Sequence, residues 1–194
     1  MPTYQESANL PALCEGLKRA LDGTAYEIIV VDDDSPDGTS EAAARIAQDD
    51  SRLTVLIRRE KPRDLARSVA LGFSAARGTI LASLNADGSH DPADLPRLLA
   101  AIAAGAEVAI GSRYVAGGRV ENWPWRRRIL SWAGTLAPRG FKVLLEVLAR
   151  GRPRAVEVPI VFRDRVHGTS KLSWRAAWLA LAGLIRLIKD TSRG

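Results

Sequence analysis

Short, continuous apolar runs alternate with helix-like patterns over the first part of the chain. The apolar runs lie at 27–32, 53–57, 79–84 and 106–110. The helical patterns between them lie at 40–49, 64–77 and 92–104. Because the runs do not alternate with polar residues, they indicate strands that are buried on both faces. Strand–helix–strand units at this rhythm predict an α/β fold with a mostly parallel sheet flanked by helices.

The rest of the pattern predicts further helices and one more strand. Asp64 and Asp91 stand where their side chains can cap the helices that follow them. Residues 1–4 are expected to form a loop. The other predicted segments are helices at 9–21, 125–137 and 140–150, a strand at 156–162 and a basic loop at 163–171. The second half is therefore expected to be less regular than the first.

An apolar segment at 172–194 is predicted to be a C-terminal helix. It carries Trp174 and Trp178 among leucine-rich faces. Such a helix can lie at a membrane interface, or it can pack against the sheet, and the sequence leaves both possibilities open. Its longest apolar stretch, 176–188, is broken by Arg186 and falls short of the ~18 residues that a spanning helix needs.

Composition and charge narrow the function classes. A chain of 194 residues with 46% apolar and 26% charged residues is ordinary for one globular domain. The single cysteine cannot form an internal disulfide, and no signal-peptide pattern follows Met1, so we expect a cytoplasmic protein. The 28 Lys and Arg against 22 Asp and Glu suggest an anionic partner, which could be a nucleotide, a lipid headgroup or nucleic acid. The basic residues lack interleaved aromatic side chains, which argues against nucleic acid.

Two polar clusters follow predicted strands, and ligands of parallel sheets bind at such strand ends. The first holds four carboxylates that could accept hydrogen bonds from a ribose or a base: Asp32, Asp33, Asp34 and Asp37. A helix cap explains Asp37 but not all four, so an external ligand is expected. In the second cluster, Asn85 and Asp87 can reach one hard cation, Mg²⁺ or Mn²⁺, that would bridge a diphosphate.

Arginines and one lysine in the second half could hold phosphate oxygens through their charged groups. These are Arg113, Arg126, Arg127, Arg128, Arg163, Arg165 and Lys171. For 126–128, a solvated or membrane-facing helix side is an equally good interpretation. His90 and His167 have no paired base and are expected to be structural.

These segments together resemble family 2 glycosyltransferases of the GT-A fold, in particular the dolichol- or polyprenol-phosphate mannose synthases. The nucleotide loop of that group is similar to 31–39, and its Pro-Thr-Tyr-Asn-Glu segment is similar to 2–6. Its metal motif resembles 85–90, and its arginine-bearing strand end resembles 111–114. Its basic loop is similar to 167–171. On this basis residues 1–171 are expected to form an incomplete GT-A domain.

The resemblance implies roles for individual residues. The residues implied to bind the nucleotide sugar are Pro2, Tyr4, Glu6, Val31, Asp33, Asn85, Ala86, Asp87 and Arg113. Those implied to hold Mg²⁺ or Mn²⁺ are Asp87, Asn85 and Ser89. Those implied to carry catalysis are Asp87, Arg113, Arg127, Arg165 and Lys171.

The implied reaction is transfer of mannose from GDP-mannose to a dolichyl or polyprenyl phosphate, with inversion, at the cytoplasmic face of a membrane. A lipid phosphate is largely dianionic at neutral pH, so it needs little help from a general base. Two alternatives remain open. One is a related enzyme that uses UDP-glucose or another sugar nucleotide, and the other is a non-catalytic remnant that binds a nucleotide or lipid.

Three departures from the family pattern generate further expectations. The first strand of the family fold has no counterpart ahead of Pro2, so a central position of the sheet is expected to stay empty. Asn85 replaces the first metal-binding Asp, which should weaken cation binding without abolishing it. Between Ala137 and Pro138 the family carries a longer stretch that includes a segment near the acceptor site.

Overall fold

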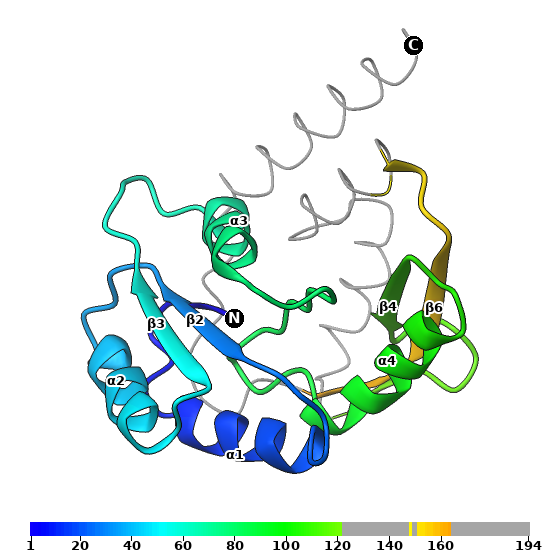
Figure 1. Cartoon of the computed structure of the whole chain (residues 1–194), viewed down its shortest axis with the longest axis horizontal. Coiled ribbons are helices and arrows are strands. Elements are labelled where there is room, and N and C mark those ends of the chain that lie inside the picture. The colour runs from blue at the N-terminus through cyan, green and yellow to red at the C-terminus, as the bar shows by residue number, and fades with distance from the viewer. Residues whose placement is uncertain (122–147, 149–150, 164–194) are drawn as a thin grey trace, which may run out of the picture.

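The computed structural model describes residues 1–121, 148 and 151–163 (Figure 1). The predicted helix at 125–137, nearly all of the one at 140–150, and the C-terminal helix lie outside these residues. The same holds for Arg127, Arg165 and Lys171, so their implied roles stay predictions.

A three-stranded parallel sheet in the order β1-β2-β3 forms the first half of the molecule. Its strands are β1 (Pro2–Thr3), β2 (Ile28–Asp32) and β3 (Leu53–Ile57). The helices that connect or cover them are α1 (Leu10–Ala20), α2 (Thr39–Asp49) and α3 (Leu65–Ala75). In Figure 1, α1 and α2 lie on one side of this sheet and α3 lies on the other. The predicted parallel sheet flanked by helices is confirmed.

The core of this half forms between α1 and β2. Apolar side chains recur on α1 at Leu10, Leu13, Cys14 and Leu17, the spacing that places them on one face of a helix. All four are buried in one cluster with Ile28, Val30, Ala43, Leu53 and Ala86. Burying each of these larger side chains contributes roughly 1.5–3 kcal/mol, so the α1 face holds the helix to the sheet.

The second half contains two separate pairs of parallel strands. The paired strands are β4 (Val108–Ser112) with β6 (Ala155–Pro159), and β5 (Arg119–Glu121) with β7 (Val161–Arg163). Helix α4 (Leu95–Ala103) follows the 3₁₀ turn η1 (Pro92–Asp94) and packs on β4 and β6. As predicted, Asp91 accepts a hydrogen bond from the Ala93 N–H at 3.0 Å at the start of η1.

The predicted strand at 156–162 is two strands, because the chain changes its partner at Ile160. The Ile160 N–H donates to Ser112 O at the end of β4, and Ile160 O accepts from the Arg119 N–H at the start of β5. The pattern of apolar residues does not reveal such a change of partner, since both halves of the run are extended and mostly apolar.

Two further expectations about the strands are wrong. Residues 1–4 do not form a loop throughout, since β1 pairs with β2 in the register Pro2 with Val31 and Thr3 with Asp32. Residues 79–84 form no strand. A strand needs a neighbour whose backbone N–H and C=O groups are within reach, and β1 offers only two residues at this edge of β2.

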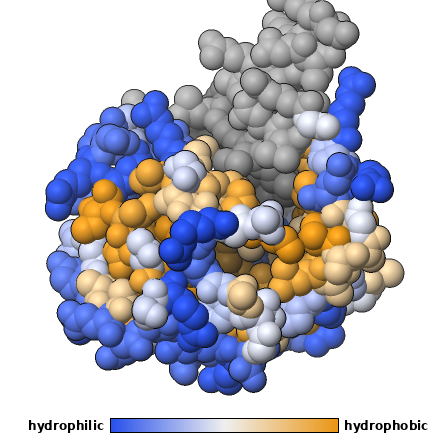
Figure 2. Space-filling view, viewed as in Figure 1, coloured by the Kyte–Doolittle hydropathy of each residue, from blue (hydrophilic) through white to orange (hydrophobic). Residues whose placement is uncertain are grey.

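A cavity of about 530 Å³ lies where residues 79–83 run past the sheet. Its walls include Ile29 of β2, Val69 and Phe73 of α3, and Leu99 of α4. The space-filling view shows apolar side chains around a hollow on this face (Figure 2). The α-amino group of Met1 donates to Ile29 O at 2.7 Å here, and burial lowers its pKa to about 6. The β1-β2-β3 sheet and the β4-β6 pair are therefore separate sheets, and no strand at 79–84 joins them.

Candidate functional site

The acidic loop after β2 is held in shape by Asp32. Its two carboxylate oxygens accept hydrogen bonds from the Ser35 N–H at 2.9 Å and from three hydroxyl groups. The hydroxyl donors are Ser35 Oγ at 2.5 Å, Ser40 Oγ at 2.6 Å and Thr3 Oγ1 at 3.0 Å. Asp32 is fully buried, so these bonds replace its hydration. Asp32 therefore connects β1, the acidic loop and α2, which is a structural role.

Asp37 and Asp34 also have partners within the protein. Asp37 accepts hydrogen bonds from the hydroxyls of Thr39 at 2.5 Å and Ser7 at 2.9 Å. Burial alone would raise the pKa of Asp37, but these bonds and the backbone N–H groups of the same residues together hold it below its usual value. Exposed Asp34 lies 3.2 Å from Lys61 Nζ. Asp32, Asp34 and Asp37 thus each have partners within the protein, and the local role expected for Asp37 agrees with its contacts.

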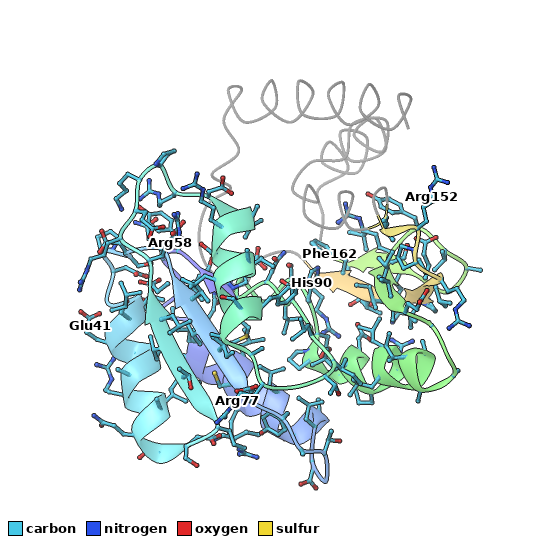
Figure 3. The ribbon with its side chains drawn as sticks, turned by 45° about the horizontal axis from the view of Figure 1, so that its top comes forward. Glu41, Arg58, Arg77, His90, Arg152 and Phe162 are labelled. Atoms are coloured by element: carbon cyan, nitrogen blue, oxygen red, sulfur yellow. The ribbon has the colours of Figure 1, made fainter. Side chains whose placement is uncertain are left out.

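Asp33 is buried and pairs with an arginine through one of its two carboxylate oxygens. Its Oδ1 accepts a hydrogen bond at 2.5 Å from Nε of Arg58, which lies directly after β3 (Figure 3). The Arg58 side chain is 2% exposed and that of Asp33 is 9% exposed. For Asp33 Oδ2 we find no hydrogen bond among the residues that the structure describes. This oxygen is available to a ligand.

The segment after β1 lies against the acidic loop, as the resemblance implied. Glu6 donates its backbone N–H to Thr39 Oγ1 at 2.9 Å, and its carboxylate accepts from Asn9 Nδ2 at 2.7 Å. The Tyr4 ring lies 3.9 Å from the Arg63 guanidinium carbon. The structure therefore brings Pro2, Tyr4, Glu6, Val31 and Asp33 together at the carboxyl ends of β1 and β2.

A second group of predicted site residues forms the loop at 85–89. Asp87 is 6% exposed, and its Oδ1 accepts hydrogen bonds from the Ser89 N–H at 3.1 Å and the Ser89 hydroxyl at 2.6 Å. Ala86 anchors the loop in the apolar core, while Asn85 is exposed. No cluster of three His, Cys, Asp or Glu side chains suited to a metal occurs within the described part of the chain.

The loop nevertheless has donors of the right chemical kind for a hard cation. Asp87, Asn85 and Ser89 supply a carboxylate, an amide and a hydroxyl oxygen. Mg²⁺ commonly takes one or two carboxylates from a protein and completes its coordination with substrate phosphates and water. The residues present therefore fit a hard divalent cation by the chemistry of their donors.

Arg113, directly after β4, lies between two aromatic rings. Its guanidinium carbon is 4.6 Å from the Phe162 ring centre and 4.8 Å from that of Tyr114, whose hydroxyl accepts from Nη2 at 2.7 Å. Contacts with ring faces orient a guanidinium group. Arg113 is thereby held at a strand end, where the sequence predicted a phosphate contact.

His90 joins Arg113 to the Asp87 loop. Its ring meets Phe162 edge-on at 5.4 Å, and both residues lie side by side in Figure 3. Burial lowers the pKa of His90, the charge of Asp87 opposes this shift and that of Arg113 adds to it. The Phe162 ring contacts both His90 and the Arg113 guanidinium, so these two residues lie beside the same ring. The expected structural role of His90 agrees with these contacts.

Arg163, which the sequence offered as a phosphate contact, has acidic partners within the protein. Its guanidinium pairs with Asp91 and lies 3.6 Å from Glu121, and its N–H donates to Ser89 O at 3.1 Å. This ion pair lowers the pKa of Asp91. Arg163 therefore fastens β7 to the start of η1 and to the Asp87 loop.

Sequence reasoning missed two residues of these groups, Arg58 and Phe162. Arg58 directly follows the predicted strand at 53–57, and a single arginine at the end of a strand does not by itself indicate a functional site. Phe162 belonged to an apolar run, and nothing in that pattern indicated that its ring supports Arg113.

Parallel strands flanked by helices, with oxygen-rich loops and an arginine at strand ends, define an α/β domain suited to a phosphorylated ligand. The family model described as "Glycosyl transferase family 2" matches residues 1–167. The chain belongs to this family, and its described fold agrees with the GT-A class.

Three curated relatives have similar sequences. "Dolichol-phosphate mannosyltransferase" of Pyrococcus furiosus is 38% identical over 97% of this chain and 62% of its own length. "Polyprenol monophosphomannose synthase" of Mycolicibacterium smegmatis is 45% identical over 68% of this chain and 50% of its own length. "Undecaprenyl-phosphate mannosyltransferase" of Micrococcus luteus is 37% identical over 89% of this chain and 86% of its own length. The chain thus spans less than two thirds of the first two relatives.

Proposed function

We propose that the chain transfers mannose from GDP-mannose to a polyprenyl phosphate, with inversion, to give a lipid-phosphate β-mannose. The observation that carries this proposal is that one ring, Phe162, contacts both the Arg113 guanidinium and His90, which directly follows Ser89, the hydrogen-bond donor to Asp87, in a member of this glycosyltransferase family. The names of these three relatives pair mannose with dolichol, polyprenol or undecaprenyl phosphate, which supports the choice of sugar and acceptor.

The two groups of residues would divide the donor between them. The group at the ends of β1 and β2 would hold the nucleoside, with the open oxygen of Asp33 accepting a hydrogen bond from it. Arg113 would contact the diphosphate. Asp87, Asn85 and Ser89 would hold Mg²⁺ or Mn²⁺, which when bound neutralises charge on the departing diphosphate. Arg127, Arg165 and Lys171 are proposed to contact the phosphates of donor and acceptor.

The reaction needs orientation and charge stabilisation more than proton transfer. A phosphate oxygen of the lipid attacks the anomeric carbon of mannose while the bond from that carbon to the diphosphate oxygen breaks. The electron pair leaves with GDP, and attack from the opposite face inverts the anomeric centre. A dianionic phosphate needs no base to remove a proton, which agrees with a structural role for His90. Arg113 stabilises the growing negative charge through a preorganised contact.

The acceptor places the reaction at a membrane surface, and we propose the cytoplasmic face. Among the helices that the structure describes, none is long and apolar enough to cross a bilayer. The segment 172–194 lies outside the described residues, and either an interfacial or a packed position would suit the proposal.

A transfer assay tests the proposal. The purified chain is mixed with Mn²⁺, a detergent-dispersed polyprenyl phosphate and either labelled GDP-mannose or labelled UDP-glucose. Label from GDP-mannose should appear in the lipid extract as an acid-labile product, and EDTA should abolish its formation. Labelling from UDP-glucose alone would overturn the choice of mannose. No transfer with either donor, also after Asn85→Asp, together with retained nucleotide binding, would identify a non-catalytic binding protein.

A further inference from the structure

Strand β3 has an arginine–aspartate pair at each of its ends. Arg52, directly before the strand, binds Asp50 through Nε at 2.8 Å and Nη2 at 2.9 Å. Arg58, directly after the strand, binds Asp33 through Nε at 2.5 Å. The first pair lies at the amino end of the strand, and the second lies at the carboxyl end, where ligands of parallel sheets bind.

The Arg58 pair is the more enclosed of the two. The Arg58 side chain is 2% exposed, whereas that of Arg52 is 46% exposed. The remaining hydrogen bonds of Arg58 reach Ser68 Oγ at 3.2 Å, Glu60 Oε2 at 3.4 Å and Pro62 O at 3.4 Å. Its backbone N–H donates to Asp32 O at 2.8 Å. Bonds to α3, to the loop after β3 and to β2 therefore fix the guanidinium from several sides.

A fixed guanidinium determines how Asp33 is presented. A carboxylate on a short side chain can rotate and exchange its two oxygens unless one of them is held. Arg58 holds Oδ1, so Oδ2 keeps one direction. A group that is oriented before binding does not lose that freedom when the ligand arrives, which strengthens the complex.

We infer that Arg58 is a positioning residue for the nucleoside of the bound nucleotide, acting through Asp33. The oriented Oδ2 would accept a hydrogen bond from a ribose hydroxyl or a base N–H group. This inference rests on the proposed function, because it requires the acidic loop to bind a nucleotide.

Calorimetric titration of GDP and UDP with Mn²⁺ tests the inference, using whichever nucleotide binds the unmodified chain more tightly. The variants are Arg58→Met, Asp33→Asn, the double variant and Arg58→Lys. Arg52→Met is the matched control, because it removes the other arginine–aspartate pair of the same strand. Thermal unfolding of every variant is recorded alongside the titrations.

We expect Arg58→Met to weaken nucleotide binding by about 10- to 100-fold, the usual effect of losing a hydrogen bond to a charged group. In the Asp33→Asn background the same substitution should change affinity by no more than about twofold, because coupled residues are not additive. Arg58→Lys keeps the charge and should bind with intermediate affinity. Arg52→Met should lower the unfolding temperature and leave affinity unchanged.

Three results would overturn the inference while the proposed function stands. They are normal affinity in Arg58→Met, an equal loss of affinity with and without Asp33, and a loss of affinity in Arg52→Met that matches that of Arg58→Met. If Arg58→Met does not fold, normal affinity in Arg58→Lys overturns it instead. Binding of neither nucleotide by the unmodified chain would refute the proposed function and the inference with it.

Discussion

Asp32 and Asp33 are neighbours in the chain and both are buried, yet their hydrogen bonds give them different roles. The oxygens of Asp32 are occupied by hydroxyl and N–H donors of the protein, whereas Oδ2 of Asp33 is open within the described structure. At the scale of single residues, the partners of a carboxylate therefore separate a structural acid from a candidate ligand.

Conversion of each acid to its amide should separate these roles. Asp32→Asn places an NH₂ group against existing donors, so we expect it to lower the free energy of unfolding by about 1–3 kcal/mol in urea titrations. Asp33→Asn should instead weaken nucleotide binding in the calorimeter, since the charged acceptor is lost. Equal effects of both variants on nucleotide affinity, after correction for unfolded protein, would contradict this division.

Elements follow from the sequence where the local pattern and the available tertiary partners agree. The apolar run 53–57 became β3 with the predicted bounds, and Asp64 caps α3 by accepting from the Ala66 N–H at 2.8 Å. The prediction of a strand at 79–84 was wrong, because a strand depends on a partner that its own sequence does not contain. The partner change at Ile160 was invisible for the same reason.

The cap of α3 gives a test at this scale. Asp64→Ala removes the acceptor for two N–H groups of the first turn, those of Ala66 and Arg67. We expect a loss of about 1 kcal/mol in the free energy of unfolding. Asp22→Ala is the control, because exposed Asp22 has no hydrogen bond among the described residues. An equal loss in both variants would mean that α3 does not depend on its cap.

On the scale of the whole molecule, the sequence predicted the α/β class and which loops carry polar groups. The loop residues form two groups, one around Asp33 after β2 and one around Asp87 with Arg113, which follows β4. The groups are separate because β2 and β4 belong to different sheets. Arg58 and Phe162 could not be predicted, since their roles arise only from long-range packing.

Closure of the α1 core can be tested through Cys14. Burial raises the pKa of its thiol to about 11, so the reactive thiolate is scarce in the folded chain. At pH 8 the folded protein should react with iodoacetamide at least about 100-fold more slowly than the chain unfolded in guanidinium chloride. Rates within a factor of three would show that this core opens readily.

The central claim is that one nucleotide spans both groups of residues. A crystal structure of the chain with GDP and Mn²⁺ tests it most directly. The account predicts the nucleoside against Asp33, and the diphosphate with its cation between Asp87 and Arg113. GDP bound elsewhere, or held by one group while the other faces solvent, would contradict the account.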